Sequence, residues 1–460
     1  MLTASIKRAA ALSSRHSLSL YRRYGSTATQ PTIPLIINGQ QVHGSESSPV
    51  ISPLTGKEVW SFSCASKHQV QEAVQNAHDT FNDWSRTKVS YRRDIFLKAA
   101  EIIEKRREEL GGYMHLELGA NKFYQDFVLG LTIEGLKDTA GRIAGAVQAF
   151  APESTHEGSE FTPRCYWAIA DVLREAGLPD GCLNLIFHSP TEAASTINTL
   201  VSHPHVKKIN FTGSTRVGRI ISSLAGKHLK PVLMELGGKA SAVVLKDADL
   251  DQAALHCARG AFLNAGQICM STERILVDES ISSEFQERLG EAIRKLFGAA
   301  DDTPAVVTAA SATRNRGLIQ DAISKGAQPL KIFEDKHAYE TDTKMRPVVL
   351  GNINKDMDLY ASESFGPSVS LFTFKTEKEA LELANDTEYG LAAAIFSKDL
   401  RVAFRLADGL ESGAVHINSM TVHDEYSLPH GGVKDSGFGR FNGYQGLDEF
   451  LYFKSVTWMD

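Results

Sequence analysis

The sequence lacks the features that mark membrane-spanning, disulfide-bonded and zinc-binding proteins. No apolar run in the 460 residues approaches the roughly 20 residues that a membrane-spanning helix needs. Five cysteines are present without a CxxC pair, and no HExxH sequence occurs. The odd cysteine count in so long a chain argues for a reducing compartment and against a disulfide framework or a bound metal.

An excess of positive charge is also missing. The net charge is -6, with 23% charged and 42% hydrophobic residues, which is ordinary for a globular protein. Without a basic field, nucleic-acid binding is excluded as the main role. The length allows two or three domains with cores of their own.

Acidic residues are absent from the first 45 positions. Residues 1–30 combine many Ser and Ala residues with five basic ones, Lys7, Arg8, Arg15, Arg22 and Arg23. This composition is typical of a mitochondrial transit peptide and predicts a mitochondrial matrix location after its removal. The alternative is a disordered tail.

Hydrophobic periodicity predicts an α/β protein. Residues 34–62 read as short strands and residues 66–150 as helices. From about Pro163, helices alternate with strands, the strands being Leu183–Phe187, Val206–Phe211 and Val232–Leu236. Alternation with short connections indicates a parallel sheet.

A second α/β pattern covers residues 237–420. Its predicted strands are Ser241–Leu245, Arg274–Val277, Ser368–Phe374 and Ala392–Phe396. The stretch Gly437–Gly439 is interpreted as a loop and not as a nucleotide fingerprint, since no predicted strand precedes it. The final stretch, Leu447–Trp458, reads as a strand able to pair with another chain.

Three segments are candidates for chemistry. Asn210–Arg219 is a strand-to-helix turn in which Gly213 allows close approach of a ligand and the helix N-terminus suits a phosphate. The alternative is a turn with nothing bound. Glu235 ends an apolar strand before two glycines, a setting that suits a general base. The alternative is a structural Glu paired with Lys239.

Cys269 is the third candidate. It follows small and polar residues in Phe262–Cys269, which suits a loop that exposes a thiol. A thiolate attacks a carbonyl and leaves a thioester, so one difficult step becomes two easier ones. The alternative is a buried structural cysteine, which is the interpretation adopted for Cys257 within a predicted helix.

Together these segments resemble the aldehyde dehydrogenase superfamily from about Ile36 to the end of the chain. The four matching motifs, in order, are the general-base motif Met234–Lys239, the nucleophile motif Phe262–Cys269, the ribose-binding motif Glu363–Pro367 and the C-terminal signature Pro429–Gly437. In the last motif, His430 stands where Phe is usual.

The resemblance implies roles for these residues. Cys269 would be the nucleophile, its backbone N–H would help to hold the oxyanion, and Glu235 would activate Cys269 or the hydrolytic water. The cofactor would be NAD, NADP not being excluded. Its predicted binding residues are Gly213, Ser214, Gly218, Glu160, Glu363 and Phe365.

The implied reaction is oxidation of an aldehyde to a carboxylic acid through a thiohemiacetal and a thioester. The implied fold is α/β, with a doubly wound cofactor-binding domain over residues 31–234, an α/β catalytic domain over 235–427 and an oligomerisation segment over 428–460. The family is usually a homodimer or homotetramer. Within it, Asn418–Glu425 and Phe438–Phe441 resemble vanillin- and salicylaldehyde-type dehydrogenases, which suggests an aromatic aldehyde.

One stretch departs from the family. The family has a strand that ends in a Pro-Trp-Asn type motif, then a helix and a second strand. Here Gln148–Pro152 leads within a few residues to Gly158–Glu160, so the Pro-Trp-Asn motif is absent and a few tens of residues are missing. The Asn expected as second oxyanion donor is absent, a loss that typically costs about 10²–10³ in rate. The Lys expected on the adenine ribose is absent too, and Glu157 stands in its place. If Glu160 still reaches the ribose, it would favour NAD over NADP.

The missing stretch would also remove two central parallel strands and a crossover helix, leaving neighbouring strands unpaired. Our hypothesis is that the chain is a splice variant or a faulty gene model of an active enzyme. Two other functions remain open, a non-catalytic member that binds subunits or partners and a thiol esterase that needs no cofactor.

Overall fold

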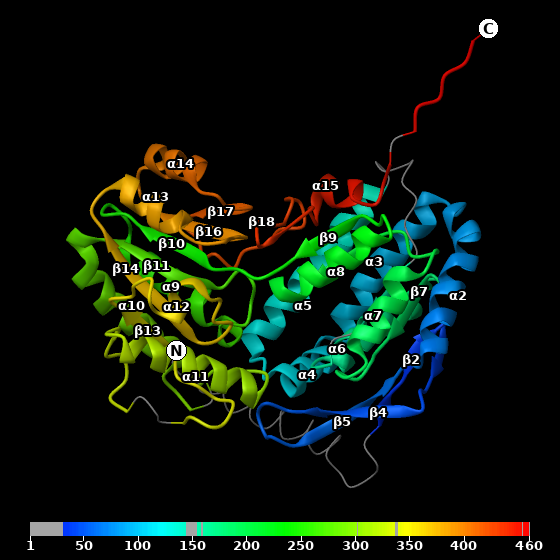
Figure 1. Ribbon diagram of the computed structural model, residues 1–460, viewed down its shortest axis with the longest axis horizontal. Helices are drawn as coiled ribbons and strands as arrows, with labels where there is room; N and C mark the ends of the chain where they lie inside the picture. Colours follow the sequence, from blue (N-terminus) through cyan, green and yellow to red (C-terminus); the bar gives the residue numbers. More distant parts are fainter. Residues whose placement is uncertain are drawn as a thin grey trace, which may run out of the picture. The chain divides into compact units, whose positions relative to one another are not determined.

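The computed structural model describes residues 31–143, 154–157, 160–300, 302–335, 339–452 and 454–459. The chain forms two units, the first made of Met1–Ala140 and Glu153–His205, the second of Gly141–Pro152 and Val206–Asp460 (Figure 1). The predicted transit peptide, residues 1–30, lies outside the described residues. The predicted domain limits stay predictions.

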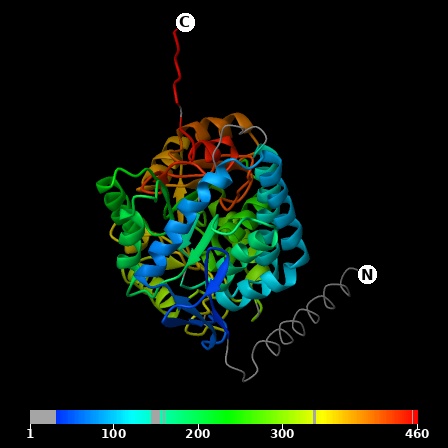
Figure 2. The same ribbon diagram turned by 90° about the vertical axis from the view of Figure 1, so that its right-hand side faces the viewer.

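Two small sheets lie in the first unit. Their orders are β1-β5-β4 and β3-β2-β7-β6. The strands are β1 Thr32–Ile33, β2 Leu35–Ile37, β3 Gln40–Val42, β4 Glu46–Ile51, β5 Glu58–Cys64, β6 Ser154–Glu157 and β7 Leu183–Ile186. Asn38 and Gly39, both with positive φ, make the tight turn between β2 and β3. β4 and β5 pair antiparallel, and the strands β1 to β5 are coloured dark blue in Figure 2.

Six helices are described in the first unit, in agreement with the predicted helical regions. They are α2 Lys67–Ser85, α3 Val89–Lys105, α4 Arg107–Leu118, α5 Lys122–Ile143, of which the last three residues belong to the second unit, α6 Pro163–Glu175 and α7 Ala193–Ser202. Ser66 and Gln69 form a capping box at the start of α2. Pro163 opens α6, and Gly177, with a φ of 100°, follows its end.

The second unit contains a three-stranded sheet with the order β19-β9-β8. The strands are β8 Ile209–Thr212, β9 Val232–Glu235 and β19 Gly437–Phe438, and the parallel pair β8–β9 ends with Thr212 opposite Glu235. The interpretation of Gly437–Gly439 as a loop is wrong in part. Gly437 and Phe438 pair antiparallel with β9, a contact that no local pattern announces.

A seven-stranded sheet of order β12-β13-β14-β11-β10-β16-β17 forms the larger part of the second unit (Figure 1). Its strands are β12 Gln328–Pro329, β13 Val348–Gly351, β14 Ser368–Phe374, β11 Thr272–Asp278, β10 Ala240–Val244, β16 Ala392–Phe396 and β17 Ala414–Ile417. A separate two-stranded pair joins β15 Tyr389–Gly390 to β18 Val433–Lys434.

Helices pack on both faces of this sheet. Alternate residues of β10 belong to different cores, Ala242 and Val244 to one with α9 and α10, Val243 to the other with α11 and α13. The helical elements of the second unit are α8 Thr215–Lys227, α9 Leu250–Phe262, η1 Leu263–Gly266, η2 Glu279–Ile281, α10 Ser282–Phe297, α11 Ala309–Ser324, α12 Asp358–Ala361, α13 Glu377–Asn385, α14 Leu400–Gly409 and α15 Gly443–Asp448. Among the described residues, no helix has the length and apolar character needed to cross a membrane.

The α/β fold class is confirmed, but β7 and β8, which follow each other in the chain, belong to different sheets. β6 pairs parallel with β7, so a strand lies in the stretch where strands are predicted to be lost. β6 and β8 each end their sheet, and among the described residues each has a partner strand on one side only. The two parallel pairs are therefore not joined into one sheet.

The C-terminal strand prediction is wrong at its first two residues, and the pairing of the rest with another chain stays a prediction. Leu447 and Asp448 end the helix α15, and the described residues that follow form no strand. Tyr452, Val456 and Trp458 are 75–81% exposed. A strand exists only with a hydrogen-bonded neighbour, and this stretch has none within a single chain.

Candidate active site

Glu235 ends β9 with its side chain turned inward, and the residue is only 5% exposed. Its Oε2 lies 3.2 Å from Nε2 of His430. Its Oε1 is buried and has no hydrogen-bond partner among the described residues. A buried acceptor left unsatisfied in this way costs free energy and points to a partner that arrives with the reaction.

Cys269 follows a loop with unusual backbone geometry. Asn264, Ala265 and Gly266 have φ angles of 50°, 60° and 72°. A Cβ on Gly266 would lie 2.3 Å from the carbonyl oxygen of Gly366, so only glycine fits there. The side chain of Gln267 holds the loop, since its Oε1 accepts from the Val307 amide at 2.8 Å. Strained, over-determined backbone of this kind gathers at functional sites.

The thiol of Cys269 lies in the electrostatic field of two carboxylates. Burial, followed by the negative charges of Glu235 and Glu363, raises the pKa of Cys269 to about 12. A Cβ on Gly238 would lie 2.2 Å from the Cys269 carbonyl oxygen, so Gly238 allows the general-base motif to touch the nucleophile loop. Cys257, by contrast, is fully buried within α9 with a raised pKa, in agreement with its interpretation as a core residue.

Glu363 approaches the same motif from the loop after α12. Its Oε1 accepts a hydrogen bond from the Gly238 amide at 2.8 Å, and a Cβ on Gly237 would lie 2.7 Å from its Oε2. Burial raises the pKa of Glu363 to about 7, and the charge of Glu273 adds to the effect. Arg314 holds the loop through the Glu363 carbonyl oxygen at 2.8 Å. The structure thus brings Cys269, Glu235 and Glu363 together.

A buried ion pair supports this loop. Lys239 Nζ lies 2.7 Å from Glu273 Oε2, with both side chains at most 5% exposed. Glu273 also accepts the amides of Ser364 at 2.8 Å and Phe365 at 3.0 Å. The alternative in which Lys239 pairs with Glu235 is therefore wrong. Sequence reasoning missed Glu273, because nothing within a buried strand marks one carboxylate as the anchor of a distant loop.

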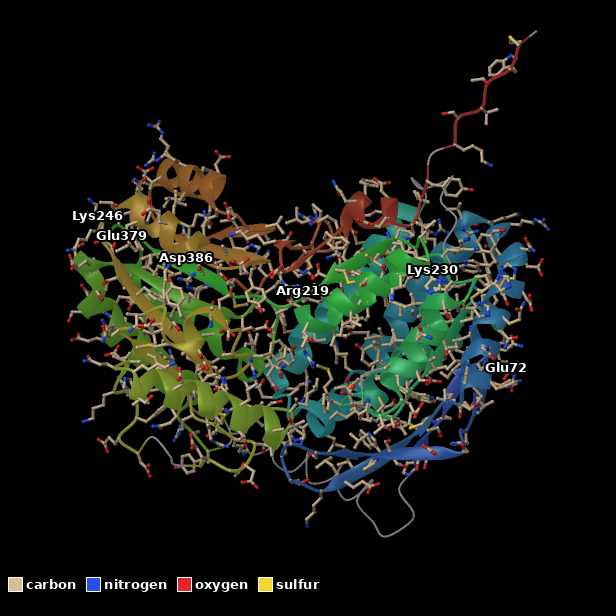
Figure 3. All side chains as sticks on the ribbon, in the orientation of Figure 1. Glu72, Arg219, Lys230, Lys246, Glu379 and Asp386 are labelled. Carbon is tan, nitrogen blue, oxygen red and sulfur yellow. The ribbon has the colours of Figure 1, made fainter. Side chains whose placement is uncertain are left out.

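Gly213 and Ser214 form the turn from β8 into α8. Ser214 caps the helix by accepting from the Val217 amide at 3.4 Å, and the earlier amides of the first turn have no partner inside the helix. A Cβ on Gly218 would lie 2.5 Å from Leu236 Cδ2, which gives this glycine a role in packing α8 on the sheet. Arg219, labelled on α8 in Figure 3, pairs with Asp435.

Two further cofactor predictions concern Phe365 and Glu160. Phe365 has a φ of 46° and is 41% exposed, so its ring is accessible. Glu160 belongs to the first unit, partly buried in the turn before α6. The roles assigned to Phe365 and Glu160, and the preference for NAD, stay predictions.

Known proteins share this sequence over nearly its whole length. Vanillin dehydrogenase of Pseudomonas fluorescens is 36% identical, over 92% of this chain and 97% of the relative. Salicylaldehyde dehydrogenase of Pseudomonas putida is 34% identical over the same shares of the two chains.

The predicted mitochondrial location is wrong by these comparisons. Both relatives are bacterial proteins, as is a third relative, the vanillin dehydrogenase of Corynebacterium glutamicum. No finding identifies residues 1–30 as a transit peptide. The prediction rested on a basic, Ser-rich composition, and segments that are not transit peptides can have the same composition.

Solved structures agree with the sequence relatives. A salicylaldehyde dehydrogenase from Pseudomonas putida G7, complexed with salicylaldehyde, has a TM-score of 0.86 and 32% identity over 91% of this chain and 96% of its own. An NAD-dependent aldehyde dehydrogenase from Sinorhizobium meliloti has a TM-score of 0.86 and 30% identity over 93% and 95%. The sequence profile of the aldehyde dehydrogenase family matches residues 41–157 and 154–456. The chain thus belongs to the aldehyde dehydrogenase family.

Proposed function

We propose that this chain oxidises an aldehyde to a carboxylic acid through a thioester on Cys269, with NAD as the cofactor. The observation that carries the proposal is the buried carboxylate of Glu235, whose charge acts on the Cys269 thiol and whose Oε1 has no partner among the described residues. A thiol with a pKa near 12 needs a base beside it to react at neutral pH.

The protein's part in the reaction follows from these groups. Glu235 accepts the thiol proton as Sγ of Cys269 bonds to the aldehyde carbon, and the Cys269 amide donates to the oxyanion. NAD supplies the hydride acceptor that turns the thiohemiacetal into a thioester. Glu235 releases that proton to solvent and then takes a proton from water as the hydroxyl attacks the thioester carbon. The C–S bond breaks, the acid leaves, and the proton held by Glu235 returns to Sγ of Cys269 to restore the thiol.

The residues present fit NAD. Gly213, Ser214 and the free amides at the start of α8 would hold the pyrophosphate. Among the described residues, Glu363 uses only Oε1 in a hydrogen bond, so its Oε2 is available to the hydroxyls of the nicotinamide ribose. The exposed ring of Phe365 would pack beside the nicotinamide. The solved relative from Sinorhizobium meliloti is described as NAD-dependent.

An aromatic aldehyde is the proposed substrate class. Two relatives at 34–36% identity are named for vanillin and salicylaldehyde, and a solved relative contains salicylaldehyde. A homodimer or homotetramer is the proposed assembly. The exposed apolar side chains of Tyr452, Val456 and Trp458 support it, because an added strand would bury them.

We also propose that an internal segment is missing. The family profile matches in two pieces that meet at residues 154–157. The alignment to the Pseudomonas fluorescens relative spans 474 positions, more than the 460 residues of this chain. β6 and β8 each end a sheet, as expected if a central strand is gone. Without the second oxyanion donor, we expect turnover about 10²–10³ below that of a complete member.

The test is NADH formation from NAD and a benzaldehyde-type substrate, monitored by absorbance. We expect a signal in the purified chain that disappears in Cys269→Ala. Cys257→Ala is the matched control, because Cys257 is buried in α9 and should leave the reaction in place. Activity that survives Cys269→Ala would reject the mechanism. No NADH formation by a folded chain would favour the non-catalytic alternative. Ester hydrolysis without NAD would favour the thiol esterase.

A further inference from the structure

His430 is fixed against Glu235. Its backbone forms a bridge with Phe441, in which the His430 amide donates at 2.9 Å and the Phe441 amide donates back at 2.7 Å. The imidazole side chain is 13% exposed, and its Nε2 faces Glu235 Oε2. The imidazole and the carboxylate are therefore both enclosed, on backbone segments that pairing holds in place.

Several charged and titratable groups surround His430. Glu235 comes from the end of β9, Asp424 and Arg440 come from the loops before and after His430, and His416 comes from β17. Burial, the largest single influence, lowers the pKa of His430. The hydrogen bond and charge of Glu235, with the charge of Asp424, outweigh it, so the pKa is raised, while Arg440 acts in the opposite direction.

The neighbouring histidines have different partners. Burial, then the charges of His423 and His430, lowers the pKa of His416 to about 4, so His416 is neutral at physiological pH. The ring of His423 lies 4.8 Å from that of His416, and its Nε2 pairs with Glu425 at 2.9 Å. Of these three imidazoles, His430 is the one bonded to the proposed general base.

The two oxygens of Glu235 differ because of this contact. His430 engages Oε2, and Oε1 is left as the buried acceptor without a partner. A carboxylate that can rotate would present either oxygen, whereas one held through Oε2 keeps Oε1 in one direction. A protonated imidazole holds it more firmly, because a charge-assisted hydrogen bond is about twice as strong as a neutral one.

We propose that His430 is a positioning residue that holds Glu235 through Oε2, so that Oε1 is the oxygen that takes the proton in the reaction. This inference rests on the proposed function. It adds a second proton-dependent step to turnover, because the hold weakens when His430 loses its proton. Below the pKa of His430 the hold is charge-assisted, and above it a neutral N–H donor remains.

The first test compares turnover against pH in the full chain and two variants. His430→Gln keeps an N–H donor that does not titrate, and His430→Phe removes the donor while inserting the residue usual in the family. In the unmodified chain we expect a second inflection in kcat above pH 6.5, where His430 loses its proton. Above this inflection, kcat should be about fivefold lower than a single titrating base would give, because the hydrogen bond to Glu235 is then weaker. His430→Gln should lose the inflection and keep most of the rate. His430→Phe should lose both, with kcat about tenfold lower and the KM for NAD within about twofold.

The second test needs neither cofactor nor turnover. The imidazole signal of His430 is assigned by NMR as the one missing in His430→Gln and is followed against pH, alone and in Glu235→Gln. We expect Glu235→Gln to lower the His430 pKa, since burial would act without the opposing charge. An unchanged His430 titration would overturn the proposal.

A chain without dehydrogenase activity would reject the proposed function and leave this inference open to the same test. In that case the rate of Cys269 alkylation by iodoacetamide replaces kcat, because the charge of Glu235 acts on that thiol. A pH inflection present in the unmodified chain and absent in His430→Gln supports the proposal. An inflection that persists in His430→Gln, in either rate, rejects it.

Discussion

Glu117 in the first unit and Glu235 in the second are both buried carboxylates, and they are satisfied differently. Glu117 is fully buried and accepts hydrogen bonds from Trp60 Nε1 at 2.8 Å, the Arg164 amide at 2.8 Å and the Cys165 amide at 3.0 Å. Glu235 has one partner, His430, and a buried oxygen with none among the described residues. A saturated carboxylate fastens elements of the fold together, whereas an unsaturated one is free for chemistry.

The strongest test of this comparison is Glu235→Gln. We expect activity to fall by about 10²–10⁴, because an amide cannot accept the proton that general base catalysis moves. The unfolding midpoint should change little, since the amide still fills the site. Turnover and thermal unfolding of the same preparation check both parts. Retained activity would show that Glu235 is not the general base.

Lys239→Ala tests whether the buried ion pair of Lys239 and Glu273 in the second unit stabilises the fold, as the hydrogen bonds of Glu117 are expected to do in the first. Removing Lys239 leaves Glu273 buried without its countercharge, which typically costs about 3–5 kcal/mol of stability. Denaturant unfolding measures the loss. Lys239→Ala with Glu273→Gln should recover part of it, because the double variant buries no charge. A single variant as stable as the unmodified chain would contradict the expected cost.

Glu117→Ala should damage the fold and spare the chemistry. The change leaves the Trp60 indole N–H and two backbone amides without their acceptor, each worth about 1–3 kcal/mol. We therefore expect a lower unfolding midpoint with unchanged turnover per folded molecule. Active-site titration with a thiol reagent counts folded sites. If Glu117→Ala lowered turnover per folded molecule as much as Glu235→Gln, the distinction between a structural and a catalytic carboxylate would be wrong.

The smallest expected effect is on the pH dependence of stability. Burial raises the pKa of Glu117 to about 7, although its hydrogen-bond donors act to lower it. The folded state thus binds a proton more tightly than the unfolded state, so stability from this group falls as pH rises from about 4.3 to about 7. Glu117→Gln should flatten the unfolding midpoint over that window. An equal slope in both chains would contradict the raised pKa.

Short strands rich in apolar residues were predictable. β14 and β16 begin and end at the predicted residues. β16 is an unbroken apolar run, and β14 mixes small polar residues with apolar ones, so both read as buried strands. β19 was missed, and the C-terminal strand is not formed by the described residues of a single chain, for one reason. A strand of two residues, or one at the end of a chain, exists only if a distant segment pairs with it.

For the site, too, features within a local motif were predictable and features that depend on distant residues were not. Cys269, Glu235 and Glu363 were recognisable because each lies in a local motif. The positive φ angles of Asn264 and Ala265 were not, because neither residue type requires them. The pairing of Lys239 with Glu273 was not predictable either, since the two residues lie 34 positions apart, Lys239 directly before β10 and Glu273 on the neighbouring strand β11.

The sequence by itself determined the family, the α/β class and the residues with reactive side chains, because apolar periodicity and short motifs are local properties of the chain. The tertiary structure alone decided that β7 and β8 join different sheets, that Glu273 anchors the loop of Glu363, and that His430 takes one oxygen of Glu235 and leaves the other. Those facts depend on which distant groups share a buried space, where each polar atom must find a partner or remain without one.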